Sequence, residues 1–320
     1  MLPSLAAIEA AASLVHRHSP PTPQYCWPLL SQRFGAEIWV KHENHSPVGA
    51  FKLRGGITYM DALKRREPNC RAVVAATRGN HGQSIALAAR LKGMTAKIYV
   101  PHGNSVEKNA AMRALGAELI EHGSDFQAAR EEAARHAGKT GAHFVPAFHE
   151  DLVRGVATLY LEFFRSTPAL DVVFVPIGQG SGINACVAAR NALGLATRII
   201  GVVSAHAPCY ALSYAAGRVL EAPVTTLLSD GLACRLPDQA ALDVILENVD
   251  AVVQVTDADV AEAMRLIFAC THNVAEGAGA AATAAALQHA PALAGKRVGV
   301  VLTGGNVDTD VFGRVLAGNV

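Results

Sequence analysis

The sequence predicts an α/β fold with two domains, each built on a mostly parallel sheet, and three observations lead to this prediction. Short apolar runs rich in β-branched residues alternate with longer amphipathic segments, a pattern typical of parallel strands covered by helices on both faces. Loops that contain glycine follow several of these runs. The 320 residues are enough for two domains, and no stretch has the composition of a flexible linker or a repeat.

The expected elements follow one another in a regular order. Residues 20–23 (PPTP) separate an N-terminal helix from the rest of the chain. Capping-box signals mark the start of two later helices, Ser124 with Gln127 and Thr256 with Asp259. The expected strands are residues 72–76, 97–100, 117–121, 143–146, 172–176, 199–203, 251–255 and 298–302.

Composition favours a globular enzyme over other classes of protein. Hydrophobic residues make up 51%, charged residues 17%, and the formal net charge is +1, which argues against disorder and against a nucleic-acid partner. No HExxH or CxxC spacing is present, so we expect no metal site. The six cysteines lie far apart, which favours reduced thiols. Without a secretory signal or a membrane-spanning apolar run, we expect a cytoplasmic protein with no membrane partner.

The stretch GAFKLRGG, residues 49–56, places one lysine in an apolar setting. Phe51 and Leu53 flank Lys52, and glycines stand on both sides. Apolar neighbours disfavour the ammonium form and lower the pKa of the amine, which suits a nucleophile. On this stretch alone, the alternative is a lysine whose aliphatic stem packs at the start of a helix.

Three polar loops follow expected strands. They are TRGNHGQ (residues 77–83), GQGSG (178–182) and TGGN (303–306). In open α/β sheets ligands bind beyond the carboxyl ends of the strands, so these loops are expected to converge on one cleft. A glycine loop that opens a helix also offers free backbone N–H groups to a phosphate.

The phosphate ligand is not expected to be a dinucleotide. The GxGxxG fingerprint requires glycine where Ile183 stands, and residues 202–205 contain no carboxylate to hold a ribose. No lysine follows the glycines, as the Walker A pattern requires. GQGSG is therefore either a cradle for a single phosphate group or only a tight turn. A single phosphate beside an activated lysine suggests pyridoxal 5′-phosphate.

Together these motifs resemble those of the fold-type II pyridoxal-phosphate enzymes, specifically the serine/threonine dehydratase and serine racemase group. The resemblance runs from about residue 22 to residue 306. GAFKLRGG is similar to the family's SFKIRGA, which implies that Lys52 carries the cofactor and that Phe51 lies near its ring. TRGNHGQ is similar to SSGNHGQ, which implies that Asn80 hydrogen-bonds the cofactor's phenolic oxygen.

The resemblance implies roles for the other motifs as well. Thr303 stands where a serine or threonine meets the pyridine nitrogen, and Glu276 begins an EGAG segment typical of the family. TRGNHGQ is expected to close on the substrate's carboxylate. The implied phosphate-binding residues are Gly178, Gln179, Gly180, Ser181 and Gly182, and the implied substrate-binding residues are Thr77, Arg78, Gly79, Asn80 and His81.

The resemblance also implies a domain organisation. Residues 1–68 and 147–320 would form a large cofactor-binding domain, and residues 69–146 a smaller inserted domain that closes on the substrate. A homodimer is the expected assembly. Because the chain ends soon after TGGN, we expect no C-terminal regulatory extension of the kind found in biosynthetic threonine dehydratases, which favours an unregulated or catabolic enzyme.

The activity implied is that of a dehydratase, which converts a 3-hydroxy amino acid to a 2-oxo acid and ammonia. Lys52 is the expected base over Cα. Thr303 offers the ring nitrogen a neutral partner and so a weaker electron sink, which suits prompt loss of a β-substituent. Serine, threonine, 3-hydroxyaspartate and 3-phenylserine all remain open as substrates.

Arg78 departs from the family pattern. The racemase has a serine at this position, and a guanidinium is a poor proton shuttle, so racemisation is a less favoured alternative. Arg78 would instead pair with a second substrate carboxylate, stack on an aryl ring or hold the loop by a salt bridge. Val203 and Cys209 stand where the racemase has acidic metal ligands, so we expect no such site.

Two further alternatives remain at this stage. A β-replacement synthase of the cysteine-synthase kind is disfavoured because its loop usually resembles SGNTG rather than TRGNHGQ. A nucleotide-binding module without amino-acid chemistry is disfavoured by Ile183 and by the missing ribose acid.

Overall fold

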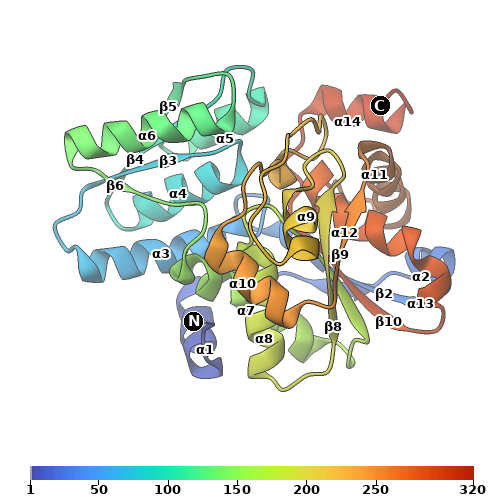
Figure 1. Cartoon of the computed structure of the whole chain (residues 1–320). Helices are drawn as coiled ribbons and strands as arrows, with labels where there is room; N and C mark the ends of the chain where they lie inside the picture. Colours follow the sequence, from blue (N-terminus) through green and yellow to red (C-terminus); the bar gives the residue numbers. More distant parts are fainter. Residues whose placement is uncertain (1) are drawn as a thin grey trace.

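A computed structural model describes residues 2–320 and contains two sheets with helices packed around them (Figure 1). The larger sheet has six strands in the order β1-β2-β10-β7-β8-β9, and only β1 and β2 pair antiparallel. The smaller sheet has four parallel strands in the order β5-β4-β3-β6. The α/β class with two sheets rich in parallel pairs is thus confirmed.

The strand bounds are close to those expected from the sequence. All eight expected strands are present, with ends that differ by at most two residues, and β1 and β2 are additional. The larger sheet consists of β1 (Gln24–Cys26), β2 (Glu37–His42), β7 (Val172–Pro176), β8 (Arg198–Ser204), β9 (Ala251–Val255) and β10 (Arg297–Leu302). The smaller sheet consists of β3 (Ala72–Ala76), β4 (Thr95–Val100), β5 (Glu118–Glu121) and β6 (His143–Phe144).

Helices cover both faces of the larger sheet. One face carries the hydrophobic cluster that includes α1 (Leu5–Val15), α7 (Glu150–Ser166), α8 (Ser181–Ala192), α9 (Cys209–Ala216) and α10 (Gln239–Asn248). The other face is covered by α2 (Pro28–Phe34), α11 (Asp257–Thr271), α12 (Gly277–Gln288), α13 (Ala290–Leu293) and α14 (Thr309–Leu316). Within residues 2–320, no helix is both long enough and apolar enough to span a bilayer.

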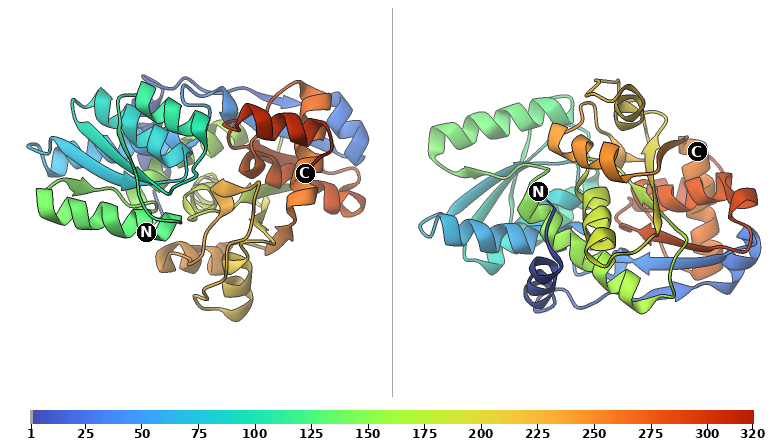
Figure 2. Two further views of the ribbon diagram at one scale, coloured as in Figure 1. Left: turned by 90° about the horizontal axis from the view of Figure 1, so that it is seen from above. Right: turned by 60° about the horizontal axis from the view of Figure 1, so that its bottom comes forward.

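The smaller sheet forms a second lobe with its own helices. These are α4 (Asn80–Leu91), α5 (Val106–Ala114) and α6 (Phe126–Thr140), and Figure 2 shows this lobe beside the larger one in both views. All four strands of the smaller sheet fall within residues 69–146. The assignment of those residues as a separate domain stays a prediction.

Helix α3 (Lys52–Arg66) packs against both lobes. Its later turns place Tyr59, Met60 and Leu63 in the hydrophobic cluster of the smaller sheet. Its first turns lie against α7, where glycine permits close contact: a Cβ at Gly155 would lie 2.2 Å from the Arg54 carbonyl oxygen. The helix that begins at the candidate lysine therefore contributes to the core of the smaller lobe and packs against α7 of the larger one.

The two expected capping boxes have different outcomes. The box at Thr256 is confirmed, with Asp259 as its reciprocal partner. The one at Ser124 is wrong, because the N-cap of α6 is Asp125, whose side chain accepts a hydrogen bond from the Ala128 N–H. Serine and aspartate are about equally good N-caps, so the residue types at these two adjacent positions do not decide where the helix begins.

Candidate cofactor and substrate site

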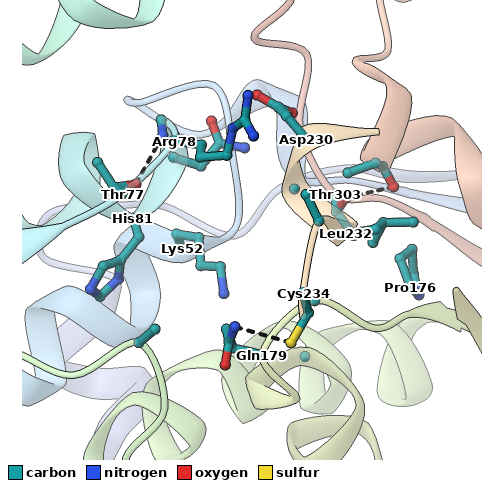
Figure 3. Close-up of a pocket in the computed structure, with 18 of the residues that line it drawn as sticks. Lys52, Thr77, Arg78, His81, Pro176, Gln179, Asp230, Leu232, Cys234 and Thr303 are labelled. Atoms are coloured by element: carbon teal, nitrogen blue, oxygen red, sulfur yellow. Dashed lines mark hydrogen bonds between the residues drawn. The ribbon is translucent and has the colours of Figure 1, made fainter. Parts of the chain in front are cut away.

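A cavity lies where the loops after β3, β7 and β10 meet the start of α3 (Figure 3). This convergence is the one expected for the carboxyl ends of parallel strands. The structure brings together every residue that the sequence nominated: the cavity is lined by Phe51, Lys52, Thr77, Arg78, Gly79, Asn80, His81, Gly178, Gln179, Gly180, Ser181, Gly182, Glu276 and Thr303. Their individual roles stay predictions.

Backbone hydrogen bonds fix the loop before Lys52 to the TGGN loop. The Phe51 N–H donates to the Thr303 carbonyl oxygen over 3.0 Å, and the Gly305 N–H donates to the Gly49 carbonyl oxygen over 2.9 Å. Gly49 has a φ of +66°, a left-handed conformation that favours glycine. A Cβ at Gly49 would also lie 2.5 Å from Asn306 Oδ1. The turn and the close approach together account for this glycine.

Lys52 is the first residue of α3, and its side chain extends into the cavity. Burial lowers the pKa of the Lys52 amine to about 8, in agreement with the apolar setting of GAFKLRGG. The amine Nζ donates a hydrogen bond to Ser181 Oγ over 3.0 Å and lies 4.8 Å from the centre of the Phe51 ring. With this pKa about a tenth of the amine is neutral at pH 7, far more than for an ordinary lysine.

GQGSG connects β7 to α8 and presents unpaired backbone N–H groups. Helix α8 begins at Ser181. Its helical hydrogen bonds start with the Asn184 N–H, which donates to the Gly180 carbonyl oxygen. The earlier N–H groups and the helix dipole together favour an anion. Gly180 has a φ of +94°, and a Cβ there would lie 2.6 Å from the Cβ of Ala241 in α10. Glycine is therefore required both by the left-handed turn and by the close approach of α10.

TRGNHGQ connects β3 to α4 and is held in shape by Thr77. Thr77 Oγ1 accepts hydrogen bonds from the N–H groups of Gly79 over 2.9 Å and Gly82 over 3.2 Å. The N–H groups of Asn80 and His81, in the first turn of α4, have no intrahelical partner. Burial, and secondarily the nearby Lys52, lower the pKa of His81 to about 3, so its imidazole is neutral.

Sequence reasoning missed Lys108, Asp230 and Cys234, which also line the cavity. Lys108 Nζ lies 2.7 Å from Asp230 Oδ2 and 3.1 Å from Glu276 Oε2. Burial alone would lower the pKa of Lys108, but the Glu276 and Asp230 carboxylates outweigh it and raise that pKa. Lysine is common on amphipathic helices such as α5, so no signal in the sequence distinguishes Lys108 from a surface lysine.

The residues present fit pyridoxal phosphate. A lysine amine of lowered pKa, the unpaired N–H groups of α8 and the Thr303 hydroxyl line one cavity. Thr303 Oγ1 makes only a long 3.4 Å hydrogen bond, to the Ala278 carbonyl oxygen, so it is available to a ligand. Two buried polar atoms of the loop, Arg78 Nε and His81 Nε2, lack a hydrogen-bond partner. These are the donor and acceptor types that a phosphorylated pyridine aldehyde and an amino acid require.

Comparison with known proteins agrees with this chemistry. The family model described as pyridoxal-phosphate dependent enzyme matches residues 15–304. The chain is 35% identical to the L-threonine ammonia-lyase of Thermotoga maritima, over 90% of this chain and 72% of that protein. It is 29% identical to the L-threo-3-hydroxyaspartate ammonia-lyase of Saccharomyces cerevisiae, over 99% of this chain and 98% of that protein.

A solved structure shares the fold over nearly the whole chain. The processed form of threonine deaminase isoform 2 from Solanum lycopersicum superimposes with a TM-score of 0.91 at 28% identity, covering 98% of this chain and 91% of that one. The cofactor and the fold-type II architecture expected from the sequence are thereby confirmed. The chain belongs to the family of pyridoxal-phosphate dependent enzymes.

Proposed function

We propose that this protein is a dehydratase that uses pyridoxal phosphate to convert a 3-hydroxy amino acid to a 2-oxo acid and ammonia. The observation that carries the proposal is the convergence of Lys52, GQGSG and TRGNHGQ on one cavity. Similarity to two ammonia-lyases over most of the chain supports elimination as the reaction. The family membership sets aside the nucleotide-binding module.

The residues that would hold the cofactor follow from the geometry of the cavity. Lys52 would carry it, the N–H groups at the start of α8 would bind its phosphate, and Asn80 would face its phenolic oxygen. Thr303 would meet its ring nitrogen as a neutral partner. When bound, pyridoxal phosphate withdraws electrons from the Cα of the amino acid and makes the Cα proton removable.

Lys52 would then move the protons. Its neutral amine, available because burial lowers the pKa to about 8, accepts the Cα proton. Ser181 Oγ accepts a hydrogen bond from Nζ and holds the amine on the α8 side of the cavity. The resulting Lys52 ammonium is a proton donor for the hydroxyl that leaves Cβ as water. The N–H groups of Asn80 and His81 would meanwhile bind the substrate's α-carboxylate.

The domain division, compartment and assembly belong to the same proposal. Residues 69–146 would close on the substrate, because they contain the whole smaller sheet and the TRGNHGQ loop. All six cysteines are free thiols, which supports a reducing, cytoplasmic compartment. A homodimer is the assembly that we propose.

The proposal is tested by assaying the holoenzyme on L-serine, L-threonine, L-threo-3-hydroxyaspartate and L-threo-3-phenylserine. We expect equal amounts of 2-oxo acid and ammonia from at least one of them, with no D-amino acid and no β-replacement product. Lys52→Ala should abolish turnover, whereas Lys64→Ala, on the same helix but outside the cavity, should not. Borohydride reduction followed by peptide mapping should place the cofactor on Lys52. An adduct on another lysine, or normal turnover by Lys52→Ala, would contradict the proposal.

A further inference from the structure

We propose that Arg78 is the receptor for a negatively charged β-substituent, so that the preferred substrate is a 2-amino-3-hydroxydicarboxylic acid. This inference rests on the proposed dehydratase function and adds the chemical class of the substituent. Arg78 is the residue at which TRGNHGQ departs from the related family loop. Its position, its lack of partners and the geometry of its donor groups support this role.

Arg78 stands at the junction of two cavities. It lines the cavity around Lys52 and also a wider, more open hollow. Figure 3 shows the Arg78 side chain above Lys52, on the side of the cavity formed by Asp230. A substrate whose Cα lies over Lys52 would extend its β-substituent outward toward this junction. The residues shared by both cavities are Arg78, Phe126, Ala147, Gln179 and Ala233.

The guanidinium of Arg78 has no anionic partner among residues 2–320. It takes part in none of the salt bridges formed there, and its Nε atom is buried without a hydrogen-bond partner. The two carboxylates of the cavity, Asp230 and Glu276, are both bound by Lys108. Arg78 therefore does not hold the loop by a salt bridge. Leaving a charged donor unpaired in a partly buried site is costly, and an incoming anion would remove that cost.

A carboxylate matches these donors better than other groups do. The planar guanidinium fork binds a carboxylate through two parallel hydrogen bonds and stays charged at every physiological pH. The substrate's α-carboxylate already has donors of its own, the N–H groups of Asn80 and His81 at the start of α4. In a 3-hydroxyaspartate-type molecule the two carboxylates are separated by only two carbons. Receptors for both are accordingly expected on one loop, and Arg78 lies in the loop that leads into α4.

The first test compares kcat/KM across the four-substrate panel for wild type, Arg78→Ser and Arg78→Lys. We expect wild type to prefer L-threo-3-hydroxyaspartate. In Arg78→Ser the ratio of kcat/KM for hydroxyaspartate to that for serine should fall about 100-fold or more, the usual cost of removing one partner of a close charge pair. Lysine keeps the positive charge but lacks the planar fork, so the ratio in Arg78→Lys should lie between those of wild type and Arg78→Ser. Arg130→Ser removes an exposed charge from the outer hollow and should leave the ratio unchanged.

The second test measures binding without turnover. L-aspartate and L-asparagine lack the hydroxyl group and differ only in the charge of the β-substituent, and their binding is followed by the change in cofactor absorbance. We expect wild type to bind aspartate more tightly than asparagine, and Arg78→Ser to lose that preference. If no panel compound is turned over but the preference for aspartate depends on Arg78, the dehydratase proposal fails, while the assignment of Arg78 as the receptor for a β-carboxylate stands.

Three results would overturn the inference. Equal affinity for aspartate and asparagine in wild type would show that the site does not recognise a β-carboxylate. An equal loss of kcat/KM on all four substrates in Arg78→Ser would place Arg78 on the α-carboxylate or in loop support. A preference for phenylserine that is lost in Arg78→Ser would show that the guanidinium stacks on an aryl ring.

Discussion

Lys52 titrates close to neutral pH because the cavity removes water from its amine, which lowers its pKa from 10.5 to about 8. Only the neutral amine can bond to an aldehyde. The rate at which apoprotein acquires cofactor absorbance should therefore rise about ten-fold per pH unit below pH 8 and level off above it. This rate can be followed in the visible spectrum after addition of pyridoxal phosphate. A rate that still rises ten-fold between pH 9 and pH 10 would show an ordinary lysine and contradict the prediction.

Single residues of the site differ in how far the sequence reveals them. Lys52 and Asn80 stand in contiguous motifs whose residue types already indicate the chemistry. Lys108 and Asp230 do not, because their contact joins α5 of the smaller lobe to the short 3-10 helix η2 (Asp230–Leu232), far along the chain. The capping residue of α6 was misplaced by one position because Ser124 and Asp125 are both good caps and only the backbone decides between them.

At the level of elements, one of the two strands that were missed is very short, and the other has a short apolar run, residues 38–40, bounded by polar residues. β1 has only three residues, and β2 includes Glu37, Lys41 and His42. Lys41 is nevertheless fully buried, and its ammonium donates to the Thr22 carbonyl oxygen and to Glu162, each over 2.7 Å. A buried strand that contains a charged side chain paired inside the molecule therefore has a sequence typical of an exposed segment. The apolar strands, by contrast, were found within two residues of their ends.

The crossing of α3 and α7 gives a prediction about packing. The Cβ of Gly155→Ala would lie 2.2 Å from the Arg54 carbonyl oxygen and from Thr58 Oγ1. Because backbone cannot move aside cheaply, we expect a loss of about 1–3 kcal/mol in unfolding free energy and weaker cofactor binding. Gly138→Ala in α6 has open space and is the matched control, with an expected gain of up to about 1 kcal/mol. Urea unfolding measures the unfolding free energy of each variant. Equal stability of Gly155→Ala and Gly138→Ala would refute the packing argument.

At the scale of the whole molecule, a buried ionic network joins β2, α3 and α7. Arg54, with no exposed surface, binds Glu43 over 2.8 Å and 3.0 Å and Glu162 over 2.6 Å and 2.9 Å. Lys41 also binds Glu162. Burial alone would raise the pKa of Glu162, but the Arg54 and Lys41 cations lower it from 4.5 to about 2. No motif in the sequence indicates this network, because Glu162 lies 108 residues beyond Arg54 in the chain.

The network predicts how stability depends on pH. Because the pKa of Glu162 is lower in the folded state, its contribution is fully present above the unfolded pKa near 4.5 and is lost as the pH falls toward 2. Glu162→Gln should cost about 3–5 kcal/mol at pH 7, since Arg54 and Lys41 lose their shared partner. The difference from wild type should shrink between pH 5 and pH 3.

This prediction is measured by urea unfolding of both proteins at pH 7, 5, 4 and 3. Glu118→Gln removes the exposed partner of Lys97 and is the matched control, with an expected cost below about 1 kcal/mol. A difference between wild type and Glu162→Gln that stays constant down to pH 3 would show that the carboxylate's charge does not support the fold.

The central place of β10 in the larger sheet governs the order in which the molecule can be assembled. Val300 pairs with Val40 on one side and with Phe174 on the other, so within the sheet the backbones of β2 and β7 are hydrogen-bonded not to each other but to β10, a strand that is synthesised long after both. Such distant pairings close slowly. Thr303 follows β10 directly, and its carbonyl oxygen accepts the hydrogen bond from Phe51 N–H that fixes the loop before Lys52. Lys52 is thus synthesised early, but the cavity around its amine is completed only after β10 has been made. An incomplete chain on the ribosome therefore lacks the site in which the amine would react with an aldehyde.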